Sequence, residues 1–299
     1  MILLRFLESK KGIEFNMIFV LVAGVIILLF FVGFAYRHIN VSKTFTDKQV
    51  LFRIESDLES YGKAFESDKP LNIPSDLSLD FKCGVINVNQ EVKNTNLIIF
   101  SPDTLLSKGF VWTKSWDYPF KITNLFYVAG SDTIFFVVDN QDVYRNLPVR
   151  FKKFYLNKEN TDLISDKLQN PNSVFVVNGD INLPANYKAK VVQIYSNREL
   201  KINGRSTKYY GDEMLYGAVF SRNLEDFECL QRKSLEHLKR ISDIYRGKAD
   251  LLKNRRDCGS IYTGMSTILG GITNDPISAN ENLKLQNRNL EKNGCVPIF

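Results

Sequence analysis

The sequence predicts an α/β protein with an N-terminal transmembrane helix, a layered mixed-sheet domain and a C-terminal helical region. Three observations predict this fold class. The first is a run of 22 residues without a charged side chain, Phe15 to Tyr36. The second is a series of apolar runs of strand length between residues 80 and 203, with helical patterns between them. The third is an amphipathic helical pattern that starts near Leu224.

The apolar run is long enough to cross a bilayer as one helix. At 1.5 Å per residue it covers the roughly 30 Å of hydrocarbon that a span requires. A cleaved secretory signal has a shorter apolar region and a small-residue cleavage site, which Gly33 to Arg37 do not offer. A buried core helix rarely carries apolar residues on every face. We therefore expect residues 15–36 to lie in a lipid bilayer, behind a basic segment at 1–14.

The segment in front of the span has a distinctive order. Lys10-Lys11-Gly12 stands directly before Ile13-Glu14 and the apolar run. This order resembles the class III signal of type IV pilin-like proteins, and the chain is similar to uncharacterised single-pass membrane proteins of archaea. The resemblance implies that a prepilin peptidase cuts after Gly12 and leaves Ile13 as the new N-terminus. Bacterial pilins have a glutamate at the fifth mature position, whereas Glu14 would be the second.

A helical pattern continues behind the span and predicts a juxtamembrane stalk over residues 37–68. Apolar residues recur there at intervals of three and four, namely Leu51, Ile54, Leu58, Tyr61 and Phe65. This stripe either packs on the chain's own body or forms a seam between subunits of a homo- or hetero-oligomer. Pro70 and Pro74 are expected to end the helix.

Residues 80–220 predict the α/β domain. Its strand-length apolar runs are 96–100, 125–128, 133–138, 173–177 and 190–195. Helical patterns at 102–116 and 160–169 separate them, although the part of the first from residue 110 onwards fits a helix or a strand. Asn203-Gly204 predicts a hairpin turn, so we expect an antiparallel edge on the sheet.

Residues 221–299 predict a helical region. One face of its first helix, which begins near Leu224, is apolar, with Phe227, Leu230, Ser234, Leu238, Ile241, Tyr245, Ala249 and Leu252. A second helix is expected at 260–269, ending at a glycine pair. A third is expected to begin at Ser278, with Glu281 completing a capping box, and to run to about Lys292.

The first helix of this region also has a basic face. Nine lysines and arginines against three acidic residues give the stretch 232–256 a net charge of +6. Lys239, Arg240, Arg255 and Arg256 are the candidate residues for binding an anion, such as a phosphate-bearing headgroup or an acidic partner. Few aromatic side chains interleave with them, which argues against nucleic acid. The alternative is an ordinary solvated face.

The four cysteines limit which disulfides and metal sites the chain can form. No two of the cysteines are close together in the sequence, and only two histidines could join them as ligands, so no zinc site is expected. The cysteines are Cys83, Cys229, Cys258 and Cys295. An even number of cysteines fits two disulfides, with three connectivities open. Because three of the four fall in the last 71 residues, we expect at least one bridge there. Free buried thiols are the alternative.

The sequence shows no catalytic motif, and we expect neither an enzyme nor a cofactor. No glycine-rich phosphate loop follows a strand, and no nucleophile has a base near it. Asp139, Asp142 and Asp180 follow predicted strands, where ligands bind in α/β sheets. They could converge on a cation, although such residues are also ordinary in turns.

Two functional hypotheses follow. The first is a structural or interaction protein in the cell membrane, with its soluble domain outside the cytoplasm, and with the resemblance implying a pilin-like subunit. The second is a membrane-tethered binding module that uses the basic helix for phosphate-bearing or acidic ligands.

Overall fold

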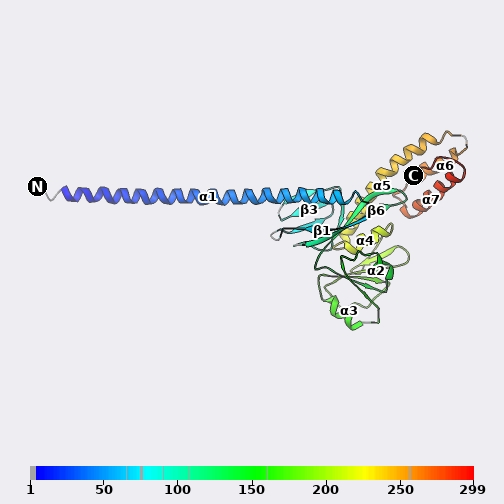
Figure 1. The fold of residues 1–299 in the computed structure, drawn as a ribbon, viewed down its shortest axis with the longest axis horizontal. Coiled ribbons are helices and arrows are strands. Elements are labelled where there is room, and N and C mark those ends of the chain that lie inside the picture. Colours follow the sequence, from blue (N-terminus) through cyan, green and yellow to red (C-terminus); the bar gives the residue numbers. More distant parts are fainter. Residues whose placement is uncertain are drawn as a thin grey trace. The chain divides into compact units, whose positions relative to one another are not determined.

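The computed structural model describes residues 5–64, 66–74, 77–89, 91–106, 108–159, 161–255 and 257–299 (Figure 1). Within these ranges the side chains of residues 5–16, 38–45 and 161–163 are not described. The chain divides into two compact units, Met1–Val50 and Leu51–Phe299.

In the first unit all described residues belong to one helix. Helix α1 covers Arg5–Tyr61, so its last residues belong to the second unit. The segment Met17–Arg37 has a mean hydropathy of 3.1, and none of it is buried inside the structure. By length and composition this segment is able to cross a membrane, which agrees with the predicted span.

In the second unit the end of α1 is part of the core. Leu51, Ile54 and Leu58 are buried, so this part of the stripe packs on the chain's own body. The helix ends at Tyr61, earlier than the predicted residue 68. The chain turns at Gly62, where a Cβ would lie only 2.8 Å from the ring of Phe126. Phe65, the last residue of the predicted stripe, lies outside the described residues.

A four-stranded sheet follows, in the order β1-β6-β7-β5. Its strands are β1 (Glu66–Asn72), β6 (Lys108–Asp117), β7 (Lys121–Gly130) and β5 (Ile98–Phe100). Pro70 lies in β1 at the edge of the sheet, where a missing N–H is tolerated. For residues 110–116, where the sequence fits a helix or a strand, the strand is confirmed, because they lie in β6; the helix expected over 102–116 therefore does not form. Aromatic and β-branched side chains favour a strand there, and Trp112 and Trp116 are fully buried.

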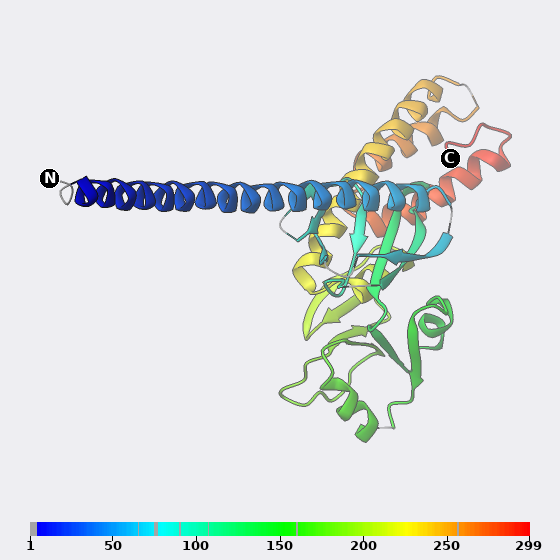
Figure 2. The same ribbon diagram turned by 60° about the vertical axis from the view of Figure 1, so that its left-hand side comes forward.

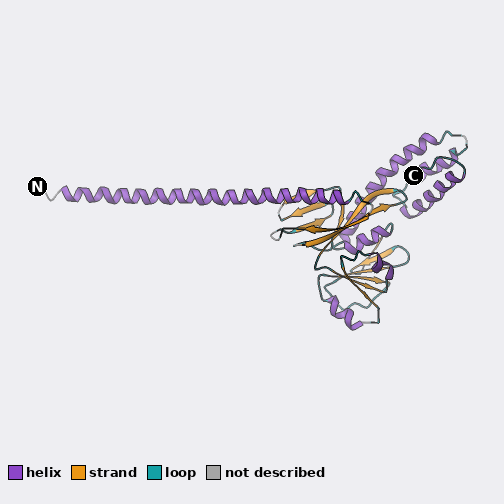
Figure 3. Ribbon diagram, viewed as in Figure 1, coloured by secondary structure: helices purple, strands orange, loops and turns teal. Residues whose placement is uncertain are grey.

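A six-stranded mixed sheet has the order β13-β12-β11-β10-β8-β9 (Figure 3). Its strands are β8 (Ile134–Val138), β9 (Lys152–Leu156), β10 (Ser173–Asn178), β11 (Lys190–Ile194), β12 (Glu199–Ile202) and β13 (Arg205–Lys208). Four neighbouring strands of this sheet, β11, β10, β8 and β9, are parallel. Helix α2 (Gln141–Asn146) connects β8 to β9, and helix α3 (Thr161–Leu168) connects β9 to β10. The predicted hairpin at Asn203-Gly204 joins β12 to β13.

Both faces of this sheet are covered, as its nearly continuous apolar strands require. Phe135 and Val176 belong to the large core that includes the four-stranded sheet and the C-terminal helices. Phe136 and Val177, one position along each strand, belong to a smaller core closed by α3. A third sheet, β2 (Leu79–Lys82), β3 (Val85–Val88) and β4 (Glu91–Asn94), is an antiparallel meander that the sequence did not predict.

Four helices complete the chain: α4 (Asp212–Phe220), α5 (Leu224–Leu252), α6 (Gly259–Gly270) and α7 (Pro276–Lys292). Figure 2 shows α5 and α6 side by side at the C-terminal end of the second unit, with α7 close to them. The short α4 was not predicted. Helix α7 begins two residues before the predicted Ser278, because Asp275 is its N-cap and accepts a hydrogen bond from the Ser278 amide. The predicted capping box is therefore wrong.

Candidate functional site

The four cysteines form two pairs. Cys83, in the turn between β2 and β3, is bonded to Cys229 on α5, with a Cα–Cα distance of 5.8 Å. Cys258, the N-cap of α6, is bonded to Cys295 after α7, with a Cα–Cα distance of 6.6 Å. The prediction of two bridges, one of them within the C-terminal region, agrees with this arrangement, and the alternative of free thiols does not.

The basic face on α5 is only partly available to a ligand. Lys239 and Arg240 on the helix are exposed, and so is Arg255, which lies beyond the end of α5 at Leu252, whereas Arg256 lies outside the described residues. Other members of the face have structural partners. The ammonium of Lys248 donates to the carbonyl oxygens of residues 297 and 298, at 2.9 Å each. Lys253 lies 3.6 Å from the carboxylate of Asp250.

Two apolar side chains interrupt this charged surface. Ile244 and Leu251 are 68% and 84% exposed. They are seven residues apart on α5, so they lie on the same side of the helix. Arg240 precedes the first by one turn, and Arg255 follows the second by four residues. The exposed surface is therefore a mixture of cationic and apolar groups.

The three carboxylates that follow predicted strands do not converge. Asp139 has a positive φ of 51° and accepts a 3.4 Å hydrogen bond from the backbone amide of Lys158. Asp180 accepts a hydrogen bond of 2.5 Å from the hydroxyl of Tyr195. Asp142 lines a different cavity. Across the described part of the chain, no group of three or more such residues is placed to hold a metal ion.

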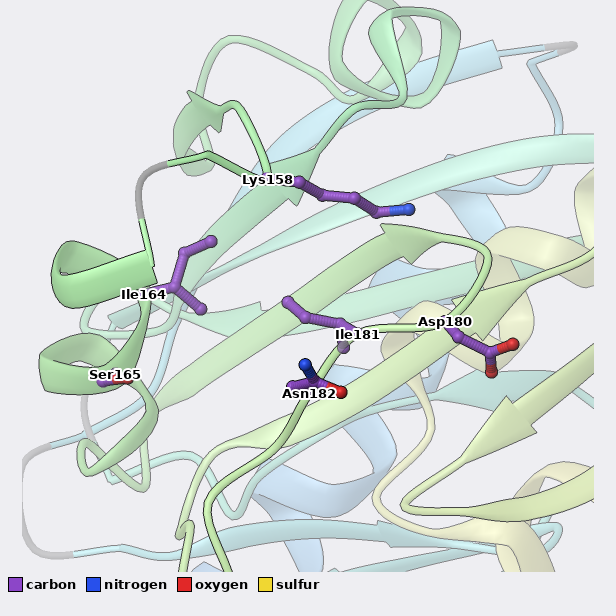
Figure 4. A pocket seen from close by; sticks show the side chains of 6 residues that line it. All are labelled: Lys158, Ile164, Ser165, Asp180, Ile181 and Asn182. Atoms are coloured by element: carbon purple, nitrogen blue, oxygen red, sulfur yellow. The ribbon is translucent and has the colours of Figure 1, made fainter.

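A hollow of about 420 Å³ lies at the carboxyl ends of β9 and β10 (Figure 4). It is lined by Lys158, Ile164, Ser165, Asp180, Ile181 and Asn182. Figure 4 shows Ile181 directed toward Ile164 on α3, while the Asp180 carboxylate points away from both. The hollow thus has an apolar floor between α3 and the loop after β10, with polar groups around it.

The two charged side chains that line this hollow form hydrogen bonds with neighbouring residues. Lys158 donates from its ammonium to the carbonyl oxygen of Asn178, at 2.5 Å. The hydrogen bond from Tyr195, together with the nearby Lys201 ammonium, lowers the pKa of Asp180. The carboxylate is therefore ionised at neutral pH. Such a hollow can bind a small molecule that has an apolar face and hydrogen-bonding groups.

Lys158 is a lining residue that the sequence prediction missed. It lies two residues after β9, a strand that the sequence did not reveal, because β9 is at the edge of its sheet and two of its five residues are lysines. Because β9 was not recognised as a strand, Lys158 could not be placed at the carboxyl edge of the sheet, where ligands bind. A signal existed in the short run Phe154-Tyr155-Leu156, which is of strand type.

A second cavity, of about 300 Å³, is acidic. Asp142 on α2 and Asp212 and Glu213 in the first turn of α4 line it, with Lys114 from β6 opposite. Burial raises the pKa of Glu213. The Lys114 ammonium lies 5.4 Å from the centre of the Tyr216 ring, which supports the lysine in this position.

The basic face, the hollow and the acidic cavity are three places that this geometry offers for recognition. The basic face belongs to one stretch of the sequence, whereas the hollow and the acidic cavity bring together residues from different elements and therefore depend on the folded second unit. In comparisons with known proteins, no family model, no curated protein and no solved structure matches the chain.

Proposed function

We propose that this chain is a single-pass membrane-anchored protein with a structural or interaction role at the cell surface, acting as a pilin-like subunit and not as an enzyme. The composition of α1 carries the proposal. Its segment Met17–Arg37 has no charged side chain before Arg37, and the last turns of the helix bury Leu51, Ile54 and Leu58 in an α/β body. In the pilin-like class that the N-terminal segment resembles, one long helix likewise serves as membrane anchor and as core element.

The disulfides support an extracytoplasmic placement of the second unit. Disulfides persist in oxidising compartments and are rare in the cytoplasm, where thiol reductants keep cysteines reduced. Here Cys83–Cys229 and Cys258–Cys295 account for all four cysteines of the chain. If the second unit faced the cytoplasm, we would expect its cysteines to be free thiols.

The experiment for the pilin-like role is to determine the N-terminus of the membrane-bound protein made in an archaeal host with its own prepilin peptidase. We expect the mature chain to begin at Ile13. Gly12→Leu should block this processing, whereas Gly33→Leu, a matched substitution where a Cβ has open space around it, should not. A mature chain that still begins at Met1 would contradict processing and leave membrane anchoring to be judged by extraction with alkaline carbonate.

The placement of the second unit is tested with a thiol reagent that does not cross membranes, applied to intact cells. We expect labelling only after a reductant has opened the disulfides, because reduction then frees the partly exposed Cys83, Cys229 and Cys295 on the outer side of the membrane. Labelling that requires lysis of the cells but no reductant would place reduced cysteines in the cytoplasm and would contradict the proposal.

The exposed surface of α5 favours a second candidate function, a tethered module that binds phosphate-bearing or acidic ligands. Ile244 and Leu251, with Arg240 one turn before the first of them, provide apolar contact together with positive charge, the combination that anionic membranes attract. Binding to vesicles of an anionic phospholipid should weaken when Lys239, Arg240, Arg255 and Arg256 are changed to Gln. Lys69 and Lys121 changed to Gln provide a control on exposed residues elsewhere. Binding that survives the fourfold change would contradict this function.

A further inference from the structure

A cavity of about 190 Å³ lies at the amino-terminal edge of the six-stranded sheet, where β10 and β11 begin. This is the opposite edge from the hollow of Figure 4. Polar residues in its wall come from the loop after β5, the start of β10, the start of β11, the β12–β13 turn and the segment before α5: Asp103, Ser173, Lys188, Lys190, Asn203 and Arg222.

Positive charge predominates in this wall. Lys188, Lys190 and Arg222 are basic, and Asp103 is the one carboxyl group among the described residues that line the cavity. The Asp103 carboxyl accepts a 3.2 Å hydrogen bond from the hydroxyl of Thr133, and burial raises its pKa.

The three cations differ in how they can act on a ligand. Lys190 donates to three backbone carbonyl oxygens at the end of α4, and burial lowers its pKa to about 7, so it offers no remaining hydrogen and only a partial positive charge at neutral pH. Arg222 is paired with Asp80 through one nitrogen, which leaves other N–H groups of its guanidinium to donate. Lys188 is exposed at the mouth of the cavity. The ligand would thus meet donors at the rim, with the partly charged amine of Lys190 behind them.

Two neutral side chains add donors. Ser173 is completely buried, and its Oγ has no hydrogen-bond partner among the described residues. The Asn203 Oδ1 accepts a 2.9 Å hydrogen bond from the amide of Val191, which fixes the side chain and leaves its NH₂ group to donate. A buried hydroxyl without a partner is costly and indicates a missing ligand or water.

We propose that this cavity binds a small oxyanion of the phosphate class, held by the Ser173 hydroxyl, the Asn203 amide and the Arg222 guanidinium, with Lys188 over its mouth. Charge-assisted hydrogen bonds from such donors suit phosphate and sulfate. The proposal does not depend on the membrane role or on the basic face of α5, because none of these residues belongs to either.

The test uses the full chain in detergent micelles and follows thermal unfolding during titration with inorganic phosphate, against chloride at equal ionic strength. A saturable rise in Tm beyond that in chloride is expected. Lys188→Gln and Asn203→Asp should each weaken the apparent affinity about tenfold, the size of one lost charge-assisted contact. Asn203→Asp keeps the acceptor for Val191 and the tolerance of a positive φ, but places a carboxylate where the donor was. Lys167→Gln, an exposed residue on α3, is the control and should change nothing.

Ser173→Ala separates a binding role from a structural one. Because the hydroxyl has no partner, its removal should leave the stability without phosphate unchanged or raised, while phosphate binding weakens. A parallel titration with glycerol phosphate distinguishes the two possible sources of the phosphate group. Tighter binding of glycerol phosphate would indicate a lipid headgroup, and tighter binding of inorganic phosphate would indicate the free ion. A Tm that follows ionic strength alone, or a phosphate response that all three variants retain, would overturn the proposal and leave water as the occupant.

Discussion

The ammonium nitrogen of Lys190 lies 2.6 Å from the carbonyl oxygen of Ala218. The same nitrogen also donates to the carbonyl groups of Val219 and Ser221. A lysine at the start of β11 thus satisfies the carbonyl groups at the end of α4, which have no partners within their own helix. This contact joins the six-stranded sheet to the helical part of the core.

The same lysine should make stability depend on pH. Burial lowers its pKa to about 7, partly opposed by the carboxylates of Asp103 and Asp226. Above that pH the unfolded chain binds a proton that the folded chain has lost, so stability should rise with pH up to the unfolded pKa. Between pH 7 and pH 9 the free energy of unfolding in guanidinium should increase by about 2 kcal/mol. In Lys190→Met the increase should vanish; an equal increase in that variant would assign it to other groups.

The two disulfides should differ in their contribution to stability. Their cysteines are 146 and 37 residues apart in the sequence. In the chain-entropy account a longer loop restricts the unfolded state more, so removal of Cys83–Cys229 by alanine substitution should cost about 5 kcal/mol, and removal of Cys258–Cys295 about 4 kcal/mol. Guanidinium unfolding of the two double variants measures both. The reverse order would mean that strain or residual structure outweighs loop length.

Gly84 should tolerate no side chain. Its φ is +71°, and the ammonium of Lys233 occupies the place where a Cβ would stand. Gly84→Ala should lower the free energy of unfolding by about 1–3 kcal/mol, from backbone strain and from displacement of the lysine. Adding Lys233→Ala should restore only the part of this free energy that is lost through the steric clash with the lysine. If the double variant is as stable as Lys233→Ala alone, the backbone conformation contributes nothing.

The end of α1 should be essential to the second unit. Leu58 is fully buried, and its replacement by alanine should lower the free energy of unfolding by about 3–5 kcal/mol through lost contacts and a cavity. Glu59→Ala, on the exposed side of the same turn, is the control and should cost little. Denaturant unfolding followed by tryptophan fluorescence measures both, because Trp112 and Trp116 lie in the same unit. Equal stability of the two variants would indicate that the stripe packs elsewhere.

Strong hydrophobic patterns account for what the sequence predicted correctly. The span, α5 and the strands β8, β10 and β11 each contain enough apolar residues to show a period or an unbroken run. Weak elements were missed for the same reason. Strand β4 is Glu91–Asn94, with a single apolar residue that is exposed, and its pairing with β3 depends on tertiary contacts that no local pattern encodes.

The candidate sites were harder to predict than the fold. The exposed arginines of α5 could be found from charge alone. Lys158 and Ser173 could not, because their roles depend on which strand edges meet and on whether a neighbouring atom accepts their hydrogen. Asp139 and Asp180 were correctly expected to follow strands, but each side chain found a partner of its own instead of a shared ligand.

The Cys83–Cys229 bridge has a consequence for proteolysis. The covalent loop it closes includes β5 to β13 and therefore the whole six-stranded sheet. One cut by a protease anywhere within that loop would leave both fragments attached to α1. Release of the six-stranded sheet from α1 would require cleavage before Cys83, and release of the intact second unit would require cleavage before Leu51, because Leu51, Ile54 and Leu58 belong to its core. A nicked molecule should therefore migrate as one chain on a denaturing gel until it is reduced.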